Sequence, residues 1–438
     1  MRRPSLRELR TVLPEGTLSV GAGLLISGLA AYAFLSLSRA GVGKEQFASV
    51  SQLWFVTFLL APGFFLPVEQ EVGRALAHRQ AIGEGGGPVV RKAAVLGLML
   101  LAAVGVVIAA LSPILVDEVF DGSWALFACL LLGFTGYACS HFTRGVLAGY
   151  GEFSRYGALM GADGIVRVAL SAALAIAGVS AVGPYGVLVG LPPLIAVGTS
   201  TRGFTRYREA GPPASWAELT PNLGWLVVGS VLAAALVNAG PVMAKLLSDP
   251  DQNDLVSEFA GAVLIARVPL FLFQAVQAAL LPKLARLAAQ GALDEFVRGF
   301  RKLLLTVIAT AALGVVGAMT IGPALVELFF DPVGRRTLTL LALGSGLYMI
   351  ALAIAQAVIA LHGHAQVALG WAVGMAAFLV ATAVSSDDLL LRVEIGLVAG
   401  PAMAMLVFAS ALRQRLAAGA SADAGSVLEA MIDVPIEP

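Results

Sequence analysis

Residues 93–116 read AAVLGLMLLAAVGVVIAALSPILV and contain no charged side chain. An α-helix of this length extends about 36 Å at 1.5 Å per residue, which is enough to cross the bilayer's hydrocarbon core of about 30 Å. Similar apolar runs recur along the chain, so the sequence predicts an all-α integral membrane protein with about 12 transmembrane helices. The other runs lie at residues 17–37, 47–67, 124–143, 157–177, 182–200, 223–246, 260–282, 303–326, 337–361, 367–386 and 395–412.

The composition of the 438-residue chain agrees with this prediction. Hydrophobic residues make up 58% of the chain and charged residues 13%, whereas a soluble protein averages about 25% charged residues. The mean hydropathy is +0.87, and the formal net charge is zero. These values argue against a soluble enzyme, a disordered chain and a nucleic-acid-binding protein, so we expect no nucleic-acid partner.

Basic residues are distributed unequally between alternate connecting segments. Segments on the side of the N-terminus contain 20 lysines and arginines, whereas those on the other side contain 5. Cytoplasmic segments carry the excess of positive charge in membrane proteins, so the sequence predicts cytoplasmic termini. Residues 1–16 are the predicted cytoplasmic N-terminal segment, and residues 413–438 are a polar cytoplasmic tail. Residues 283–302 are basic and amphipathic, which is typical of an interfacial helix or of a simple positive anchor.

The two halves of the chain resemble each other at a nearly constant shift. Residues 113–121 read PILVDEVFD and residues 323–331 read PALVELFFD, a shift of 210. A second match compares VLAGYG at 146–151 with VIALHG at 358–363. Such internal symmetry is common in transporters. It predicts two six-helix bundles, at 17–200 and 223–412, joined by a cytoplasmic linker at 201–222. Because six is even, the two bundles form a parallel repeat.

The chain resembles the MOP superfamily and, within it, the Wzx-like flippases of polysaccharide biosynthesis. Besides the repeated motif, the resemblance rests on RGVLAGYGEFSRYG at 144–157 and RVPLFLFQAVQAALLPKLAR at 267–286. It implies a MATE-like, V-shaped pair of bundles around a central cavity that opens alternately to each side. It also implies a bacterial inner-membrane location and a lipid-linked oligosaccharide substrate. Membrane lipids and other polysaccharide-assembly proteins are the further partners that it implies.

A polar stripe in the predicted eighth helix is the main candidate for the substrate cavity. Arg267 lies about seven residues into this helix from the outer side, and Gln274 and Gln277 follow at nearly helical spacing. A charge at this depth is costly and suggests a functional site. The forked guanidinium donors match phosphate oxygens, so Arg267 could meet a pyrophosphate. The alternative is an arginine that reaches outer headgroups.

Asp163 and Arg167 are four residues apart in the predicted fifth helix, which places both on one face. One interpretation is a self-neutralised pair that stabilises helix packing. In the other, a substrate anion competes for Arg167, or Asp163 binds a coupling proton or sodium ion. Arg167 and Arg267 are the deep cations, because the first predicted helix has no basic residue in its interior.

Asn238 and Gln356 are further candidates for the cavity, although a glutamine at mid-helix more often bridges helices. Asn238 shares a face with Lys245, and the intervening Gly240-Pro241 can break the helix. Lys245 lies near the outer end, where snorkelling to the headgroups is the favoured interpretation.

The sequence predicts neither catalytic residues nor a cofactor. His362 and His364 lack a neighbouring cysteine or carboxylate, which argues against a metal site. Glu69 and Glu71 are the best candidates for a membrane transferase, but no catalytic histidine or acidic metal cluster accompanies them in the sequence. Cys129 and Cys139 are about 15 Å apart on one helix, too far for a disulfide.

A flippase for a polyprenyl-linked oligosaccharide is therefore the favoured hypothesis. It would carry the headgroup from the cytoplasmic to the outer leaflet by alternating access, while the lipid tail stays in the bilayer. The alternatives are a cation-coupled multidrug exporter, which predicts unpaired carboxylates in the cavity, and a non-transporting scaffold of envelope assembly.

Overall fold

The computed structural model describes residues 17–219, 223–270, 292–327, 332–361 and 363–418. The first bundle, the N-lobe, begins at α2 and ends with α8. Its helices are α2 (Thr17–Val42), α3 (Lys44–Ala81), α4 (Gly87–Ala110), α5 (Ser112–Ile114), the π-helical turn η1 (Leu115–Val119), α6 (Trp124–Gly149), α7 (Phe153–Ile176) and α8 (Val182–Ser200).

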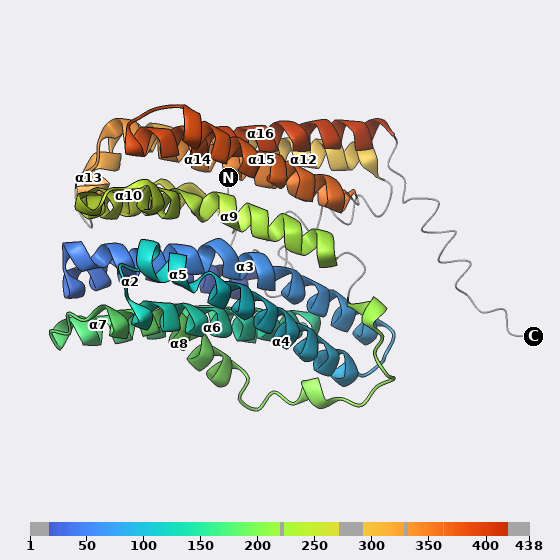
Figure 1. The fold of residues 1–438 in the computed structure, drawn as a ribbon. Helices are drawn as coiled ribbons and strands as arrows, with labels where there is room; N and C mark the ends of the chain where they lie inside the picture. The colour runs from blue at the N-terminus through green and yellow to red at the C-terminus, as the bar shows by residue number, and fades with distance from the viewer. Residues whose placement is uncertain (1–16, 220–222, 271–291, 328–331, 362, 419–438) are drawn as a thin grey trace, which may run out of the picture.

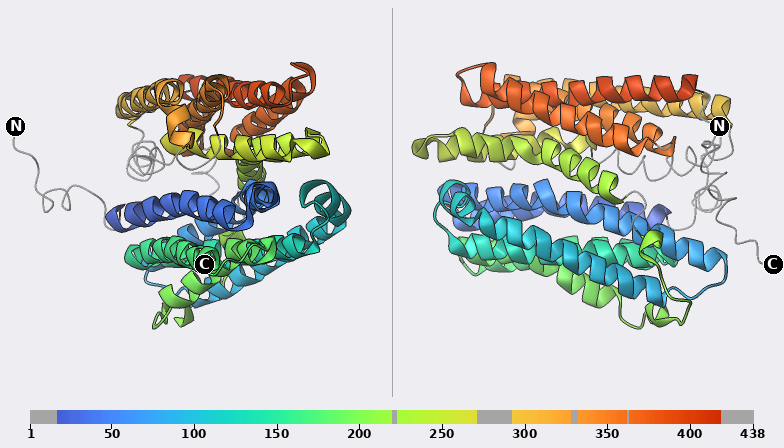
Figure 2. Two further views of the ribbon diagram at one scale, coloured as in Figure 1. Left: turned by 90° about the vertical axis from the view of Figure 1, so that its left-hand side faces the viewer. Right: turned by 45° about the vertical axis from the view of Figure 1, so that its right-hand side comes forward.

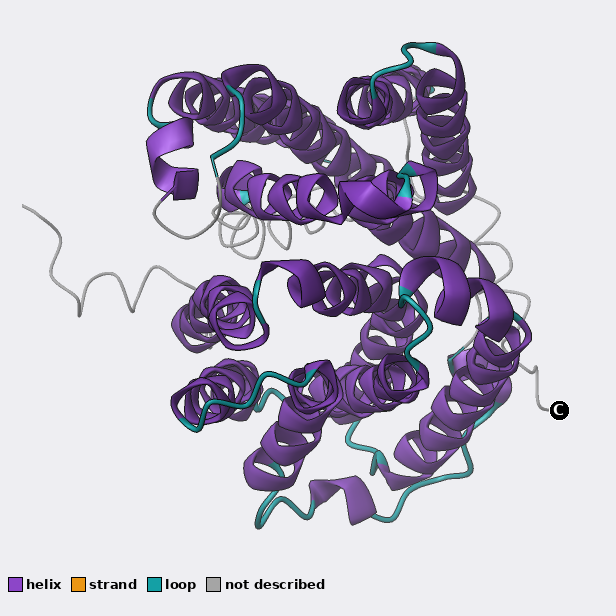
Figure 3. Ribbon diagram, turned by 60° about the vertical axis from the view of Figure 1, so that its left-hand side comes forward, coloured by secondary structure: helices purple, strands orange, loops and turns teal. Residues whose placement is uncertain are grey.

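A linker with two 3-10 turns, η2 (Arg206–Arg208) and η3 (Trp216–Glu218), leads to the second bundle, the C-lobe. Within the described residues, the C-lobe is helical throughout, as Figure 3 shows. Its elements are α9 (Leu223–Leu247), the 3-10 turn η4 (Pro250–Gln252), α10 (Asn253–Ala266), α12 (Leu293–Thr320), α13 (Gly322–Glu327), α14 (Arg335–Ala360), α15 (His364–Val384) and α16 (Leu389–Ala417).

The two lobes lie side by side as two layers of helices (Figures 1 and 2). Helix packing repeats between them: α2 packs on α7 as α9 packs on α15, and α6 and α7 both pack on α8 as α14 and α15 pack on α16. The predicted parallel repeat is therefore present in the packing. The lobes meet mainly where α3 crosses α9, with a further contact between α3 and α10.

The surfaces of the bundles are those of a multi-pass membrane protein. Among the described residues, 11 helices are long and apolar enough to cross a bilayer. The two least buried of these helices are α4 and α12, which occupy equivalent places in the repeat. Leu98 and Val106 on α4 and Leu313 on α12 are exposed, as expected for side chains that face lipid.

The two ends of the bundles differ in charge and are called the basic end and the acidic end. The basic end carries the α3–α4 turn at residues 82–86 and the described part of the linker at residues 201–219, where Arg202, Arg206 and Arg208 lie. The acidic end carries the α9–α10 connection at residues 248–252, where Asp249 and Asp251 lie. The repeated motif lies at the acidic end, since α5–η1 follows α4 there and α13 follows α12.

Several predicted helix limits are wrong. The helix expected at 47–67 is α3, which continues to Ala81, and the helix expected to end at 143 is α6, which continues to Gly149. The helix expected at 260–282 begins at Asn253 as α10 and reaches its C-cap at Arg267. The basic stretch from Leu293 to 302 is the start of α12 rather than a separate interfacial helix, and residues 283–291 lie outside the described residues.

Glycines allow the closest helix contacts in the N-lobe. Gly136 on α6 faces Gly190 on α8, and a Cβ at Gly136 would overlap with the backbone oxygen of Gly190. Small residues permit such approaches in membrane proteins, where packing rather than hydrophobicity drives helix association. This contact therefore depends on the absence of a side chain.

Gly136→Ala tests this packing. The added methyl group meets backbone rather than a mobile side chain, so we expect a loss of about 1–3 kcal/mol of stability and a lower melting temperature in detergent. Gly97→Ala is the matched control, because a Cβ at Gly97 meets nothing within 4 Å. The control should be neutral or slightly stabilising. Equal melting temperatures for both variants would contradict the assigned contact.

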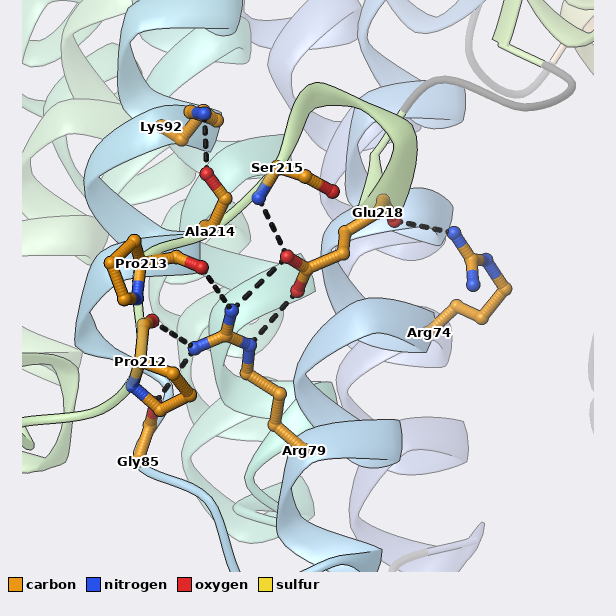
Figure 4. A network of polar contacts seen from close by, with 9 residues as sticks. All are labelled: Arg74, Arg79, Gly85, Lys92, Pro212, Pro213, Ala214, Ser215 and Glu218. Carbon is orange, nitrogen blue, oxygen red and sulfur yellow. Dashed lines mark hydrogen bonds and ion pairs between the residues drawn. The ribbon is translucent and has the colours of Figure 1, made fainter. Parts of the chain in front are cut away.

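The linker is fixed to the basic end of the N-lobe by Arg79 at the end of α3 (Figure 4). The Arg79 guanidinium is buried and donates to both carboxylate oxygens of Glu218, at 2.9 and 3.1 Å. It also donates to the carbonyl oxygen of Pro212 at 2.8 Å, and Lys92 donates to the carbonyl oxygen of Ala214 at 2.5 Å. These contacts hold the linker against the N-lobe.

Glu218→Gln should loosen the linker. Burial opposes ionisation of Glu218, but the hydrogen bonds from Arg79 and the Ser215 backbone prevail and lower its pKa below 4.5. The ion pair therefore stabilises the docked linker fully above about pH 4.5, and this contribution is lost as the pH falls through the lowered pKa. Hydrogen exchange of residues 206–219 at neutral pH should be faster in Glu218→Gln than in the parent.

Glu209→Gln is the control, since Glu209 pairs with Arg206 inside the same linker at 3.0 Å. Its exchange should remain close to that of the parent. The assigned role of Arg79 would be wrong if both variants exchanged alike.

Candidate functional site

Two successive aromatic residues of α3, Trp54 and Phe55, each contact a buried guanidinium. The guanidinium of Arg167 on α7 lies over the Trp54 ring, 5.2 Å from its centroid. The guanidinium of Arg267 lies over the Phe55 ring, 5.6 Å from its centroid. Because Arg167 belongs to the N-lobe and Arg267 to the C-lobe, α3 is the helix that both cations share.

Arg267 is at the C-cap of α10, where the residue is 9% exposed. It follows 14 helical residues, about 21 Å of helix, so it lies deeper than the predicted 10 Å. Its guanidinium donates to the side-chain oxygen of Asn238 at 2.9 Å and to the carbonyl oxygen of Val237. Among the described residues, its polar contacts are therefore with neutral groups.

Asn238 connects Arg267 to the N-lobe. While its side-chain oxygen accepts from Arg267, its amide donates to the carbonyl oxygen of Phe58 on α3 at 2.9 Å. A second hydrogen bond crosses between the lobes nearby, from the Tyr32 hydroxyl to the carbonyl oxygen of Leu264 at 2.8 Å. Two of the predicted site residues, Arg267 and Asn238, are thus brought together at the lobe interface.

A small pocket of about 20 Å³, room for about one water molecule, adjoins Arg267 on its C-lobe side. Most of its lining is apolar, and Arg267, Ser345 and Tyr348 supply its polar side chains. Tyr348 donates its hydroxyl to the carbonyl oxygen of Ala233 at 3.1 Å. This pocket lies within the C-lobe, between α9, α10, α14 and α16, and not between the two lobes as the implied central cavity would.

Arg167 is part of a satisfied buried network. It is 1% exposed and forms the expected pair with Asp163 at 2.7 Å. It also donates to the carbonyl oxygen of Leu188 at 3.1 Å and to the Tyr137 hydroxyl at 3.2 Å. These contacts join α6, α7 and α8, so the geometry matches the packing interpretation of the pair.

Of the remaining predicted site residues, Gln356 is the one that the structure describes. Gln356 is half-buried on α14 and is not among the residues that line the pocket. Gln274 and Gln277 lie outside the described residues. Gly240-Pro241 does not break the helix, because α9 runs from Leu223 to Leu247.

A buried cluster around Glu69 is a feature that sequence reasoning missed. The Glu69 carboxylate on α3 contacts Arg144 and His141 on α6, both at 2.8 Å, and accepts from the Tyr156 hydroxyl at 2.7 Å. The helix predicted from hydropathy ends at residue 143, before the first charged side chain, and this places Arg144 in a connecting segment. The sequence does carry a signal for this cluster. Glu69 lies just beyond the apolar run at 47–67 and Arg144 just beyond the run at 124–143, so an acidic and a basic residue follow two runs that end on the same side of the membrane.

Two further buried charges differ from expectation. Lys245 does not snorkel, because its amine pairs with Asp121 at 2.7 Å and the residue is 8% exposed. Glu394 on α16 was not considered, yet it is fully buried and lies 3.6 Å from the Arg336 guanidinium. Within the described residues, no three histidine, cysteine or acidic side chains are placed to hold a metal ion.

Comparison with known sequences identifies relatives in mycobacteria. Uncharacterized protein Rv3630 of Mycobacterium tuberculosis is 30% identical over 378 residues, which cover 80% of this chain and 81% of the relative. Uncharacterized protein Rv1510 of the same species is 27% identical over 346 residues, 72% of this chain and 73% of the relative. No family model matches the sequence.

Solved structures of MATE transporters have the same fold. An inward-facing multidrug resistance MATE family transporter of the MOP superfamily superposes with a TM-score of 0.68 at 15% identity, covering 91% of this chain and 96% of that one. A MOP superfamily transporter from Pyrococcus furiosus, described as having a binding pocket of reverse polarity, has a TM-score of 0.66 at 16% identity, covering 92% and 95%. The all-α, two-bundle fold predicted from the sequence is thus confirmed.

Asp163→Asn should destabilise the N-lobe. Without the carboxylate, Arg167 is a buried cation that lacks a counter-charge, and breaking such a pair costs about 3–5 kcal/mol. The melting temperature in detergent should fall by several degrees. Asp117→Asn, an exposed site in η1, is the control and should leave it unchanged. An unaltered melting temperature in Asp163→Asn, together with a changed proton or sodium dependence of transport, would instead assign Asp163 to ion coupling.

Proposed function

We propose a transport function for this chain, which belongs to the same family as Rv3630 of M. tuberculosis and has the fold of MATE transporters. Its cargo is a polyprenyl phosphate- or pyrophosphate-linked oligosaccharide, which it moves from the cytoplasmic to the outer leaflet by alternating access. The sugar serves cell-surface polysaccharide synthesis, in contact with other proteins of that assembly.

The observation that carries this proposal is Arg267. A guanidinium at this depth is costly, and here its described polar partners are the neutral oxygens of Asn238 and Val237. Its positive charge therefore remains uncompensated by a carboxylate of the described chain. A phosphate group from the cargo supplies both the missing charge and oxygens that match the guanidinium fork.

The surroundings of Arg267 suit a lipid-linked anion. The adjoining pocket is mainly apolar, and the lobes contact each other at the same level through the Asn238–Phe58 hydrogen bond. A cargo phosphate that draws Arg267 away from Asn238 weakens that link between the lobes. Substrate binding and lobe movement are coupled in this way only if the two conformations bind the phosphate unequally.

A cation-coupled drug exporter is supported less well. Such a protein needs carboxylates that are free to bind a cation, but Asp163 is paired with Arg167 and Glu69 with Arg144. The buried Glu394 has a looser contact, 3.6 Å from Arg336. The P. furiosus transporter described above as having a pocket of reverse polarity supports the view that one fold serves different pocket charges. A non-transporting scaffold is an outcome that the experiment below distinguishes.

We propose an inner-membrane location with both termini in the cytoplasm. The support is the distribution of basic residues, 20 against 5 between alternate connecting segments. In this orientation the acidic end faces outward and the linker held by Arg79 faces the cytoplasm.

Arg267→Gln tests the function in proteoliposomes that contain a fluorescent polyprenyl-pyrophosphate oligosaccharide. We expect the flipping rate to fall at least about tenfold, which corresponds to a loss of about 1.4 kcal/mol. Arg267→Lys keeps the charge but loses the forked geometry, so its rate should be intermediate.

Arg298→Gln is the matched control, because Arg298 is an exposed arginine at the start of α12. It should flip the lipid at the parental rate. Normal flipping by a folded Arg267→Gln protein would remove Arg267 from the mechanism. Absence of flipping by the parent chain itself, with lipid binding intact, would favour the scaffold.

A further inference from the structure

Two lysines cross between the lobes at the acidic end, one from each lobe. Lys245 on α9 of the C-lobe contacts Asp121 of the N-lobe, with 2.7 Å between the amine and the carboxylate. Lys44 at the start of α3 contacts Glu258 and Asp254 on α10, at 3.1 and 3.4 Å. Each lobe thus supplies a lysine to acidic residues of the other.

The Lys245 contact is the more buried of the two. Its amine is also 2.7 Å from the side-chain oxygen of Asn253, and Ser49 on α3 donates to the other oxygen of Asp121 at 2.7 Å. The lysine is 8% exposed, so salt screens this pair much less than a surface pair. The Asp121 side chain is 42% exposed, so lobe separation returns chiefly the lysine amine to water, at the cost of the attraction between the two charges.

The backbone around Asp121 holds its carboxylate in place. Asp121 has a positive φ of 50° and Gly122 a φ of 80°, in the short turn between η1 and α6. The turn is fixed on its far side by Ser123, whose hydroxyl accepts from the Leu126 amide at the start of α6. A residue other than glycine rarely adopts a positive φ, so the turn presents Asp121 in one defined position.

Arginines at the basic end contact their own lobe or the linker instead. Arg79 and Arg206 join the N-lobe to the linker, since Arg206 donates to Gln80. Arg415 on α16 donates to Gln366 and to the carbonyl oxygen of Leu361, all within the C-lobe. Among the described residues, these arginines form no ion pair between the lobes, whereas the acidic end has two lysines that do.

We propose that the reciprocal ion pairs of Lys44 with Asp254 and Glu258, and of Lys245 with Asp121, form a clasp that keeps the acidic end closed. The clasp must break before the lobes can separate at this end. The strength of the clasp then sets the ratio of the closed to the open conformation at the acidic end, independently of the cargo.

Electron–electron distance measurement between two spin labels tests the clasp. Labels are attached at Glu118→Cys in the N-lobe and Asp251→Cys in the C-lobe, in a Cys129→Ala/Cys139→Ala background. Both sites are exposed, lie at the acidic end and take no part in the clasp. The protein is reconstituted in lipid nanodiscs without substrate, so the readout does not depend on which cargo is carried.

Lys245→Met and Asp121→Asn should each raise the ratio of the longer to the shorter distance about tenfold, equivalent to about 1.4 kcal/mol. Where Lys245→Met fails to fold, Lys44→Gln, at the more exposed pair, should raise the ratio in the same direction by a smaller factor.

Asp387→Asn is the matched control, because Asp387 is an exposed charge at the acidic end that belongs to the C-lobe and takes no part in the clasp. It should leave the distance distribution unchanged. The clasp would be refuted by an unchanged distribution in both Lys245→Met and Lys44→Gln. It would equally be refuted if Asp387→Asn produced the same shift as they do.

Discussion

A buried cation must exchange its hydration for contacts within the protein, and the two deep arginines do so in different ways. Arg167 has a carboxylate, a hydroxyl and a carbonyl oxygen as partners, so its charge is balanced inside the N-lobe. Arg267 has an amide and a carbonyl oxygen, which satisfy its hydrogen bonds but leave its charge unbalanced within the described chain. The structure therefore uses one guanidinium for packing and leaves the other suited to an anion. Because Trp54 and Phe55 place both against α3, the two roles meet on one helix.

The unbalanced charge of Arg267 lies next to a hydrogen bond that joins the two lobes. Asn238 accepts from Arg267 and donates across to Phe58, so a ligand that engages Arg267 acts directly on a link between the lobes. The acidic end carries ion pairs between the lobes, and the Lys245 amine is the most buried partner among them. Two sets of contacts between the lobes can therefore influence lobe movement, namely the hydrogen bonds of Asn238 and the ion pairs at the acidic end. We propose that the first responds to cargo and that the second sets the resting conformation.

Much of the fold could be predicted from sequence, because lipid requires every spanning segment to be helical and apolar. The internal repeat was also predictable, because similar motifs follow α4 and α12 in the sequence. Hydropathy did not predict the position of a charge that has its partner on another helix. It places Arg144 and Glu69 in connecting segments, but they pair with each other inside the protein. It places Lys245 at the headgroups, but Lys245 pairs with Asp121. The depth of Arg267 was also underestimated, because α10 begins at Asn253. The Asp163–Arg167 pair was predictable, since both partners lie on one helix at a spacing that brings them together.

The most direct test of the proposed function is the profile of polyprenyl-linked intermediates in a host depleted of this protein and of redundant flippases, measured separately for the two leaflets. We predict that one lipid-linked oligosaccharide accumulates on the cytoplasmic leaflet, and that the parent chain restores its transfer whereas Arg267→Gln does not. An unchanged profile in the depleted host would contradict the proposed cargo and return the choice to drug export or scaffolding.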